Sequence, residues 1–380
     1  MAEINQFCTD PITCYAQSGK SDRLALSPNN NLVHIYRQQD SSWVEEFVLS
    51  QHDLRVTSID WAPKTDRIVT CSADRNAYVW VQSEGIWKPT LVLLRINRAA
   101  TSVKWSPNED KFAVGTAAKL VCICYFESAN DWWISRHIKK PIKSTVTCLD
   151  WHPNSVFLAC GSTDYKSRIF STFIKEVDQT KVNESNLKTS SWLRNRSDSF
   201  DDSSIAITGT LLNEFPNSGA WVHDVAFSPD GSRLAWVSHD SSISVVDSNI
   251  SMTALSLKTR YLPFLSCVWV SHGSLVAAGH DCCPMLFTYQ RPDKASPTLK
   301  FIGRLDRSQR KEVDGQSAMR KFRDLDAKAD NHQPGSGDSC LSTIHQNTIG
   351  QIRLCSKSQT VATAGLDGKL VVWSLDPSVL

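Results

Sequence analysis

One pattern recurs along this chain and restricts the folds that the chain can adopt. In its clearest copy, residues 56–63 alternate between apolar and polar positions and include Trp61 near their end. A second apolar run follows at 68–72, then comes Asp74, and a third run ends at Trp80. Alternation with a period of two indicates β-strands, and an aspartate suits a tight reversal between two strands. The pattern therefore predicts a small antiparallel sheet.

Seven copies of this pattern can be traced along the chain. The other six are found at 12–36, 101–107, 146–153, 222–229, 265–272 and 349–354. Trp61, Trp105 and Trp151 follow one another at intervals of 44 and 46 residues. A repeat of about 40–45 residues with four strands per unit is typical of a β-propeller. The sequence therefore predicts an all-β fold, a seven-bladed propeller of the WD40 type formed by one domain of residues 1–380.

The N-terminus is predicted to complete the ring of blades. The last copy stops after its third strand at Trp373, whereas residues 4–8 precede the first copy and have no partner within it. Pairing this N-terminal strand with the last blade would remove two exposed sheet edges. We therefore expect an N-terminal strand to close the propeller.

A spaced aspartate marks four of the copies. It stands six residues before the end of the third strand, as Asp74 does before Trp80. We expect His52 to bond Asp74, with a threonine or serine hydroxyl relaying the network to Trp80, because a satisfied buried network stiffens a fold. The predicted structural residues are His52, Asp74, Trp80, Asp164, Asp281, His345, Asp367 and Trp373.

Two insertions depart from the repeat. Residues 176–204 are rich in serine and asparagine, a composition that buries little apolar surface and favours a flexible spacer, with a docking role for Trp192 as the alternative. Residues 303–345 contain, at 317–328, an apolar stripe with helical spacing that includes Phe322 and Leu325. Such a short helix is marginal alone, so it must pack on its own propeller or, as we expect, in the groove of a partner.

A basic turn joins the third copy to the fourth. Lys139, Lys140 and Lys143 surround Pro141 on a chain whose charges otherwise nearly cancel, with 41 Lys and Arg against 39 Asp and Glu. This turn is either an ordinary solvated connector or a docking site for an acidic segment.

Composition and motifs exclude several classes of function. The formal net charge of +2 indicates no global attraction to nucleic acid or membrane, and no segment is apolar for long enough to span a bilayer. No secretory signal is visible, so the twelve cysteines are expected to be free thiols in a reducing compartment. The sequence contains no phosphate-binding loop, hydrolase motif or metal-spaced cluster, which predicts a protein without a cofactor or catalytic activity.

Several phrases also resemble a known family. They are residues 130–133, 137–141, 237–241, 275–282, 303–306 and 320–326. Together they resemble the WD40 subunit of the actin-related protein 2/3 complex over nearly the whole chain. The resemblance implies a non-catalytic scaffold in the cytoplasm, at the actin cytoskeleton, that supports nucleation of branched filaments. It implies contacts with the other subunits, with the actin filament and with activators that carry acidic tails.

The resemblance also assigns roles to individual residues. It implies an apolar contact and a charged rim in the late insertion, and a site for the activator's acidic tail at the basic turn. These protein-binding residues are Met319, Phe322, Leu325, Arg320, Lys321, Arg323, Lys139, Lys140 and Lys143. The main alternative is a WD40 substrate receptor or signalling adaptor outside the actin system. A propeller enzyme would require histidines and carboxylates that converge around the central channel.

Overall fold

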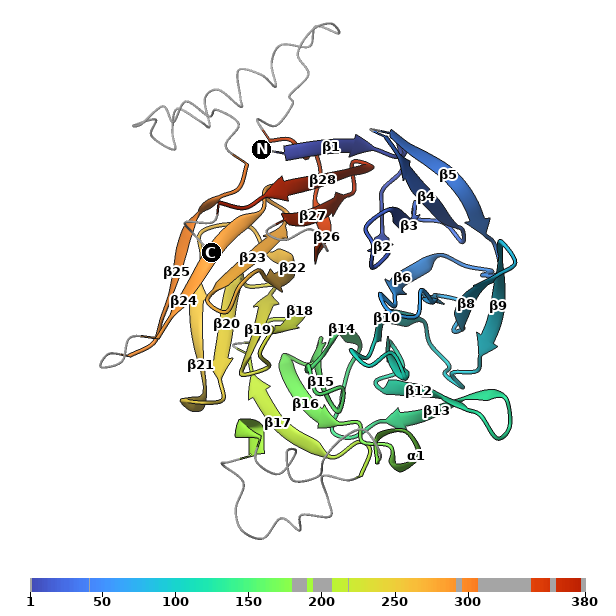
Figure 1. Ribbon diagram of the computed structural model, residues 1–380. Coiled ribbons are helices and arrows are strands. Elements are labelled where there is room, and N and C mark those ends of the chain that lie inside the picture. Colours follow the sequence, from blue (N-terminus) through green and yellow to red (C-terminus); the bar gives the residue numbers. More distant parts are fainter. Residues whose placement is uncertain are drawn as a thin grey trace, which may run out of the picture.

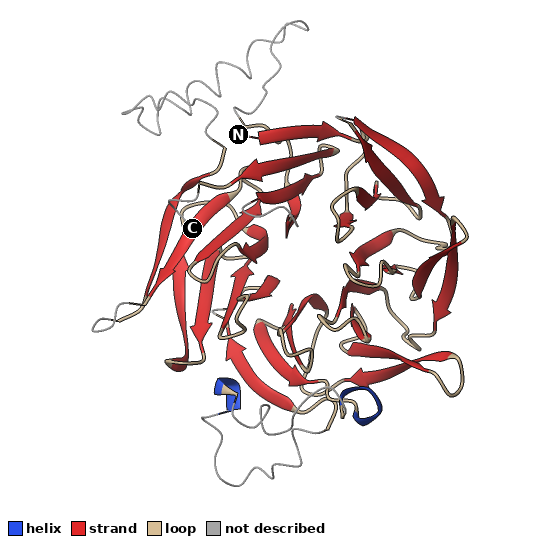
Figure 2. Cartoon of the chain, viewed as in Figure 1, coloured by secondary structure: helices blue, strands red, loops and turns tan. Residues whose placement is uncertain are grey.

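Seven four-stranded antiparallel sheets surround a central axis in the computed structural model, as Figure 1 shows. The structure describes residues 2–40, 42–179, 190–193, 207–217, 219–291, 296–306, 343–355 and 360–376. Strands make up nearly all of the regular structure in this part of the chain (Figure 2). The helices described are a single turn, α1 (Lys175–Asp178), and a 3₁₀ turn (Ser191–Leu193). The predicted all-β, seven-bladed propeller is confirmed.

The first four blades follow the chain in order, each from its inner to its outer strand. Blade 1 contains β2 (Cys14–Gln17), β3 (Arg23–Ser27), β4 (Val33–Gln39) and β5 (Ser42–Leu49). Blade 2 contains β6 (Val56–Trp61), β7 (Ile68–Ser72), β8 (Ala77–Ser83) and β9 (Ile86–Val92). Blade 3 contains β10 (Ala100–Trp105), β11 (Lys111–Thr116), β12 (Val121–Glu127) and β13 (Trp132–Ile138). Blade 4 contains β14 (Val146–Trp151), β15 (Phe157–Ser162), β16 (Lys166–Ser171) and β17 (Leu211–Pro216).

The last three blades complete the ring. Blade 5 contains β18 (Val222–Phe227), β19 (Arg233–Ser238), β20 (Ser242–Asp247) and β21 (Ser251–Lys258). Blade 6 contains β22 (Phe264–Trp269), β23 (Ser274–Gly279), β24 (Met285–Gln290) and β25 (Thr298–Arg304). Blade 7 contains β26 (Ile349–Leu354), β27 (Thr360–Gly365) and β28 (Lys369–Ser374), and its outer strand is β1 (Ala2–Gln6).

The N-terminal strand closes the propeller. β1 pairs antiparallel with β28, and Ala2 lies opposite Trp373 while Gln6 lies opposite Lys369. The prediction of this closure is confirmed, although the strand begins two residues earlier than the predicted segment 4–8. Blade 7 is therefore built from both ends of the chain, which removes the free edges that an open ring would expose.

A β-bulge recurs at the start of six inner strands. In blade 2, Val56 and Ser58 pair with consecutive residues of β7, which leaves Thr57 as the extra residue, and the same shift is present in blades 3 to 7. The hydroxyl groups of Thr57, Thr101 and Thr147 each donate to the first carbonyl of the next blade's inner strand, at 2.9, 2.6 and 2.6 Å. In blades 2 to 4 the bulge therefore links neighbouring blades through hydrogen bonds.

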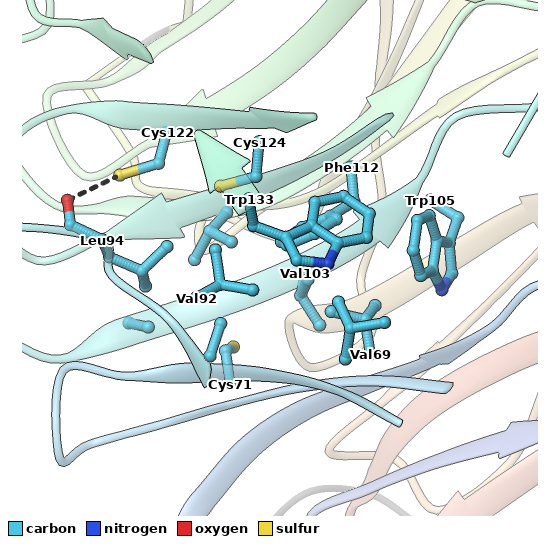
Figure 3. Close-up of a cluster of buried hydrophobic side chains, with 14 of the residues drawn as sticks. Val69, Cys71, Val92, Leu94, Val103, Trp105, Phe112, Cys122, Cys124 and Trp133 are labelled. Carbon is cyan, nitrogen blue, oxygen red and sulfur yellow. Dashed lines mark hydrogen bonds between the residues drawn. The ribbon is translucent and has the colours of Figure 1, made fainter. Parts of the chain in front are cut away.

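Apolar side chains fill the space between successive blades. Figure 3 shows the cluster between blades 2 and 3, where the rings of Trp105 and Trp133 lie edge to face with centroids 5.9 Å apart. Cys71, Cys122 and Cys124 are buried in the same cluster as free thiols, as the sequence predicted. Burial raises the pKa of Cys71 to about 12, so this thiol behaves as a small apolar side chain.

The order of strands places two sets of loops on one face. Because the four strands of a blade alternate in direction, the connections between blades lie on the same side as the turns between second and third strands. We call this side the connector face. A central channel of about 650 Å³ runs between the inner strands, with Arg353 and the Lys104–Asp150 pair (2.8 Å) at its wall. Arg353 also donates to Asp60 at 2.6 Å. In the described part of the chain, no helix is long and apolar enough to cross a membrane.

Candidate functional site

Four aspartates tie the connector face together. Asp74, in the turn between β7 and β8, accepts the backbone N–H of Asp53, which leads into the same blade, at 3.1 Å. Asp164, Asp281 and Asp367 accept the corresponding N–H groups of blades 4, 6 and 7 at 2.9, 2.7 and 2.9 Å. Each carboxylate thus holds the connection that enters a blade against the turn of that blade. The common spacing in the sequence reflects this shared geometry.

Two of these aspartates belong to histidine networks. His52 Nδ1 lies 2.8 Å from Asp74, and His52 Nε2 lies 2.8 Å from the hydroxyl of Thr70, to which Trp80 Nε1 also donates at 3.0 Å. Blade 7 repeats the arrangement with His345, Asp367, Thr363 and Trp373. Both imidazoles are buried, so they serve as internal braces and do not face a substrate.

Blade 4 uses a different partner. The guanidinium of Arg168 donates to both oxygens of Asp164, at 3.0 and 2.9 Å, and its Nε donates to Glu214 on β17 at 2.8 Å. Arg168 is 1% exposed although it carries a permanent charge. Arg168 and Glu214 were not predicted from the sequence, because an arginine within a strand more often faces solvent. The sequence contains one weak indication of a different partner for Asp164: no histidine stands at the start of its blade.

Charge and burial act on these carboxylates in opposite directions. Burial raises the pKa of Asp164, but the hydrogen bonds from Arg168 and from the Lys143 backbone outweigh it, and the net pKa is lowered. The same balance, with the histidine as donor, lowers the pKa of Asp74 and of Asp367. These groups are tuned to remain ionised, as structural braces require.

The basic turn lies on the connector face between β13 and β14. Lys139, Lys140 and Lys143 are exposed, whereas Ile142 between them is buried and anchors the turn. The backbone N–H of Ile142 donates to the carbonyl of Lys139 at 3.1 Å. The structure therefore brings the three predicted lysines onto one short, anchored turn whose side chains reach solvent.

These lysines belong to a wider basic surface that was not predicted from the sequence. The connector loops and turns of blades 2 to 4 carry eight exposed cations. This basic patch consists of Arg55, Arg75, Arg95, Arg98, Lys119, Lys139, Lys140 and Lys143. In the same loops and turns, Asp53 is the one exposed acidic side chain. The cations are spread over five segments of the sequence, so they do not form a run of charge from which the patch could be predicted.

The late insertion begins and ends on the connector face. Met319, Arg320, Lys321, Phe322, Arg323 and Leu325 lie outside the described residues. The flanks of the insertion meet beside blade 7, where the backbone N–H of Ile344 donates to Asp306 at 2.8 Å. At the edges of the predicted insertion 303–345, residues 303 and 304 belong to β25, and His345 braces blade 7.

The earlier insertion is attached to the propeller at two points. In α1, Asp178 forms a fully buried ion pair with Lys111 of blade 3, at 2.5 Å. Trp192 is 1% exposed and donates to the carbonyl of Gly231 in blade 5 at 2.8 Å. The alternative of Trp192 as a docking residue for a partner is therefore wrong. An indole needs apolar neighbours, and Phe215 and Phe227 of its own propeller supply them.

Comparisons with known proteins agree with the repeat. Residues 43–81, 209–247 and 338–374 match the family described as WD domain, G-beta repeat. Residues 99–195 match the anaphase-promoting complex subunit 4 WD40 domain. In the described part of the chain, no three His, Cys, Asp or Glu side chains are grouped so that they could hold a metal ion.

Matches to relatives over nearly the whole chain are more specific than matches to the repeat. The chain is 49% identical over 376 residues to actin-related protein 2/3 complex subunit 1A-B of Xenopus laevis, an alignment that covers 97% of this chain and 95% of that protein. It is 39% identical over 382 residues to subunit 1 of Schizosaccharomyces pombe, with 95% and 96% covered. It is 38% identical over 386 residues to subunit 1A of Arabidopsis thaliana, with 99% and 97% covered. The similarity therefore extends well beyond the repeat.

Proposed function

The chain belongs to the family of the actin-related protein 2/3 complex subunit 1, and from this premise we propose that it is a non-catalytic scaffold of that complex in branched actin nucleation. The observation that carries the proposal is the identity of 49% over 97% of the chain. The buried histidine networks agree with it, because groups that could do acid–base chemistry are used as braces. A scaffold needs rigid blades and exposed loops, and the propeller provides both.

The finer proposal concerns partners outside the complex. The basic patch suits an acidic tail of an activator, since opposite potentials attract and speed association. Residues 317–328 suit a contact with the actin filament, through Met319, Phe322 and Leu325 and the charged residues Arg320, Lys321 and Arg323. The protein would then act in the cytoplasm, at the actin cytoskeleton.

Affinity purification tests membership in the complex. The tagged full-length chain, recovered from its own cells in mild salt, should bring down two actin-related proteins. Recovery of neither actin-related protein would refute the scaffold proposal.

Charge removal tests the basic patch. In the assembled complex, Lys139→Ala/Lys140→Ala/Lys143→Ala should weaken binding of a tryptophan-containing acidic peptide by roughly tenfold at low salt, and by less at high salt. The control variant removes the same charge from exposed lysines outside the patch, with Lys20→Ala, Lys88→Ala and Lys300→Ala. Equal losses in the two variants would show that only net charge matters.

The helical stripe has its own test. Phe322→Asp/Leu325→Asp should leave assembly of the complex intact but lower branch formation, as counted by fluorescence microscopy of growing filaments. Unchanged branching would remove these residues from the proposed contact.

A further inference from the structure

The connector face has a second region with a different character. Across the loops and turns of blades 5 and 6, which span 217–221, 239–241, 259–263 and 280–284, Arg260 is the one described residue that is both exposed and permanently charged. Trp221 and Leu262 are 47% and 54% exposed in the same loops. Three histidines accompany them. We call Trp221, His223, His239, Leu262 and His280 the neutral patch.

His223 occupies the bulge position that threonine fills in blades 2 to 4. Val222 and Asp224 pair with consecutive residues of β19, so His223 is the extra residue of β18. Thr57, Thr101 and Thr147 use this position to bond the next blade. Bulges re-aim side chains, and they are frequent beside functional sites. In blade 5 the bulge presents an imidazole to the connector face, and the hydroxyl link to the next blade is given up.

Two histidines of the patch are hydrogen-bonded to each other. His223 Nε2 lies 2.9 Å from His239 Nδ1, a bond that needs one ring to donate and the other to accept. Burial, together with the charges that His239 and His280 would carry, lowers the pKa of His223 to about 4. His223 is therefore uncharged at neutral pH.

Within each of the two blades, the members of the patch are neighbours. The ring of Trp221 lies 5.4 Å from that of His239, and the backbone N–H of His239 donates to the carbonyl of Trp221 at 2.9 Å. On blade 6, the backbone N–H of Leu262 donates to Asp281 at 2.7 Å, and that of His280 donates to the carbonyl of Pro263 at 3.2 Å. Blades 5 and 6 thus present an exposed indole, an exposed leucine and the uncharged imidazole of His223 on the connector face.

We propose that the neutral patch is the surface through which this scaffold holds an uncharged, apolar segment of another subunit of its complex. This inference rests on the proposed function. The match is one of charge: an ionised partner group placed here would lose water and would find Arg260 as the one exposed, permanently charged side chain among the described residues of these loops and turns, whereas an apolar segment has no charge to desolvate. Aromatic side chains are enriched among the residues that dominate binding, and permanent interfaces are poorer in charge than reversible ones. The basic patch has the opposite character.

Substitutions with matched controls test the proposal in the assembled complex. Leu262→Asp with Trp221→Ser should lower recovery of the other subunits on the tagged chain at least tenfold. The control is Leu54→Asp with Trp132→Ser, because Leu54 and Trp132 are 55% and 50% exposed and Leu54 likewise stands two residues before an inner strand. The control should retain the subunits. Equal recovery with the two double variants, whether high or low, would overturn the proposal.

A single substitution guards against a folding defect. His223→Thr restores the residue type of blades 2 to 4, so the propeller should melt at an unchanged temperature while subunit recovery falls. Full recovery with this variant would show that the imidazole is not part of the interface. If the wild-type chain itself recovered no subunits, the proposed function would fail and the inference with it. Failure of the variants alone to lose subunits would overturn only the inference.

Discussion

Blades 2 and 4 hold the same connection with different chemistry. In both, an aspartate in the turn between second and third strands accepts a backbone N–H from the segment that enters the blade. In blade 2 the aspartate is supported by His52, which passes the network on to Thr70 and Trp80. In blade 4 it is supported by Arg168, which also binds Glu214 of the outer strand. The turn is kept while its support changes.

The difference shows which interaction contributes the stabilisation in each brace. The histidine brace satisfies its polar atoms through hydrogen bonds along one chain of side chains, each worth about 1 kcal/mol net. The arginine brace buries a permanent charge, which is tolerable only while both carboxylates remain in place. Blade 4 should therefore be the more sensitive of the two to loss of its central residue. Three experiments test this comparison.

The largest effect is expected in blade 4. Arg168→Ala would leave the nearly buried carboxylate of Asp164 without a counter-charge, so the free energy of unfolding should fall by about 3–5 kcal/mol. Denaturant unfolding of the purified chain measures it. The control is Arg37→Ala, since that side chain is 50% exposed and lies 3.9 Å from Glu46. A loss below about 1 kcal/mol is expected for such a surface pair. Equal losses for the two variants would contradict the account of the buried charge.

A smaller effect is expected in blade 2. His52→Ala leaves one oxygen of Asp74 and the Thr70 hydroxyl without their ring partner, which should cost about 2–3 kcal/mol of unfolding free energy. His345→Ala removes the corresponding ring from blade 7 and should cost about the same. His34→Ala, at a histidine that pairs with an exposed glutamate, is the control. If His52→Ala proved more damaging than Arg168→Ala, buried charge would not be what separates the two braces.

The regular features shared by the blades are the ones that could be predicted from the sequence. The period of the tryptophans and the alternation within each copy report directly on the blades, because every blade buries the same faces against its neighbours. The aspartate spacing predicted four turns, since a tight reversal needs the same residue type each time. The closing strand followed from one unpaired segment and one missing strand. All of these features depend on local order along the chain.

What escaped prediction depends on residues that are distant in sequence. Arg168 binds Glu214 across a long insertion, and Lys111 finds Asp178 from another blade. The basic patch is assembled from single residues in five loops and turns, so only the ring geometry brings it together. The polar flanks of Trp192 favour a flexible spacer, yet its indole is buried against apolar side chains of the propeller. Local composition cannot report such contacts.

Acid should expose the smallest difference between the braces. The folded-state pKa of Asp164 lies below its unfolded value, so the unfolded chain binds more protons as the pH falls. The contribution of this carboxylate is therefore complete above about pH 4 and is lost as the pH falls through the lower folded-state value, by at most about 1.4 kcal/mol per pH unit. The Asp164→Asn variant has no carboxylate at this position to protonate, so it cannot lose this contribution to the unfolding free energy. Its unfolding free energy should consequently fall less steeply than that of the wild type between about pH 4 and pH 3, and the curves from denaturant titrations measure both slopes.

Asp74→Asn should also reduce the fall in unfolding free energy with falling pH. The change should be larger for Asp164→Asn in blade 4, because in the wild type the guanidinium of Arg168 stays charged beside a protonated Asp164. Identical slopes in the wild type and in Asp164→Asn would mean that the arginine brace contributes nothing through charge, and that its two braced carboxylates act only as hydrogen-bond acceptors.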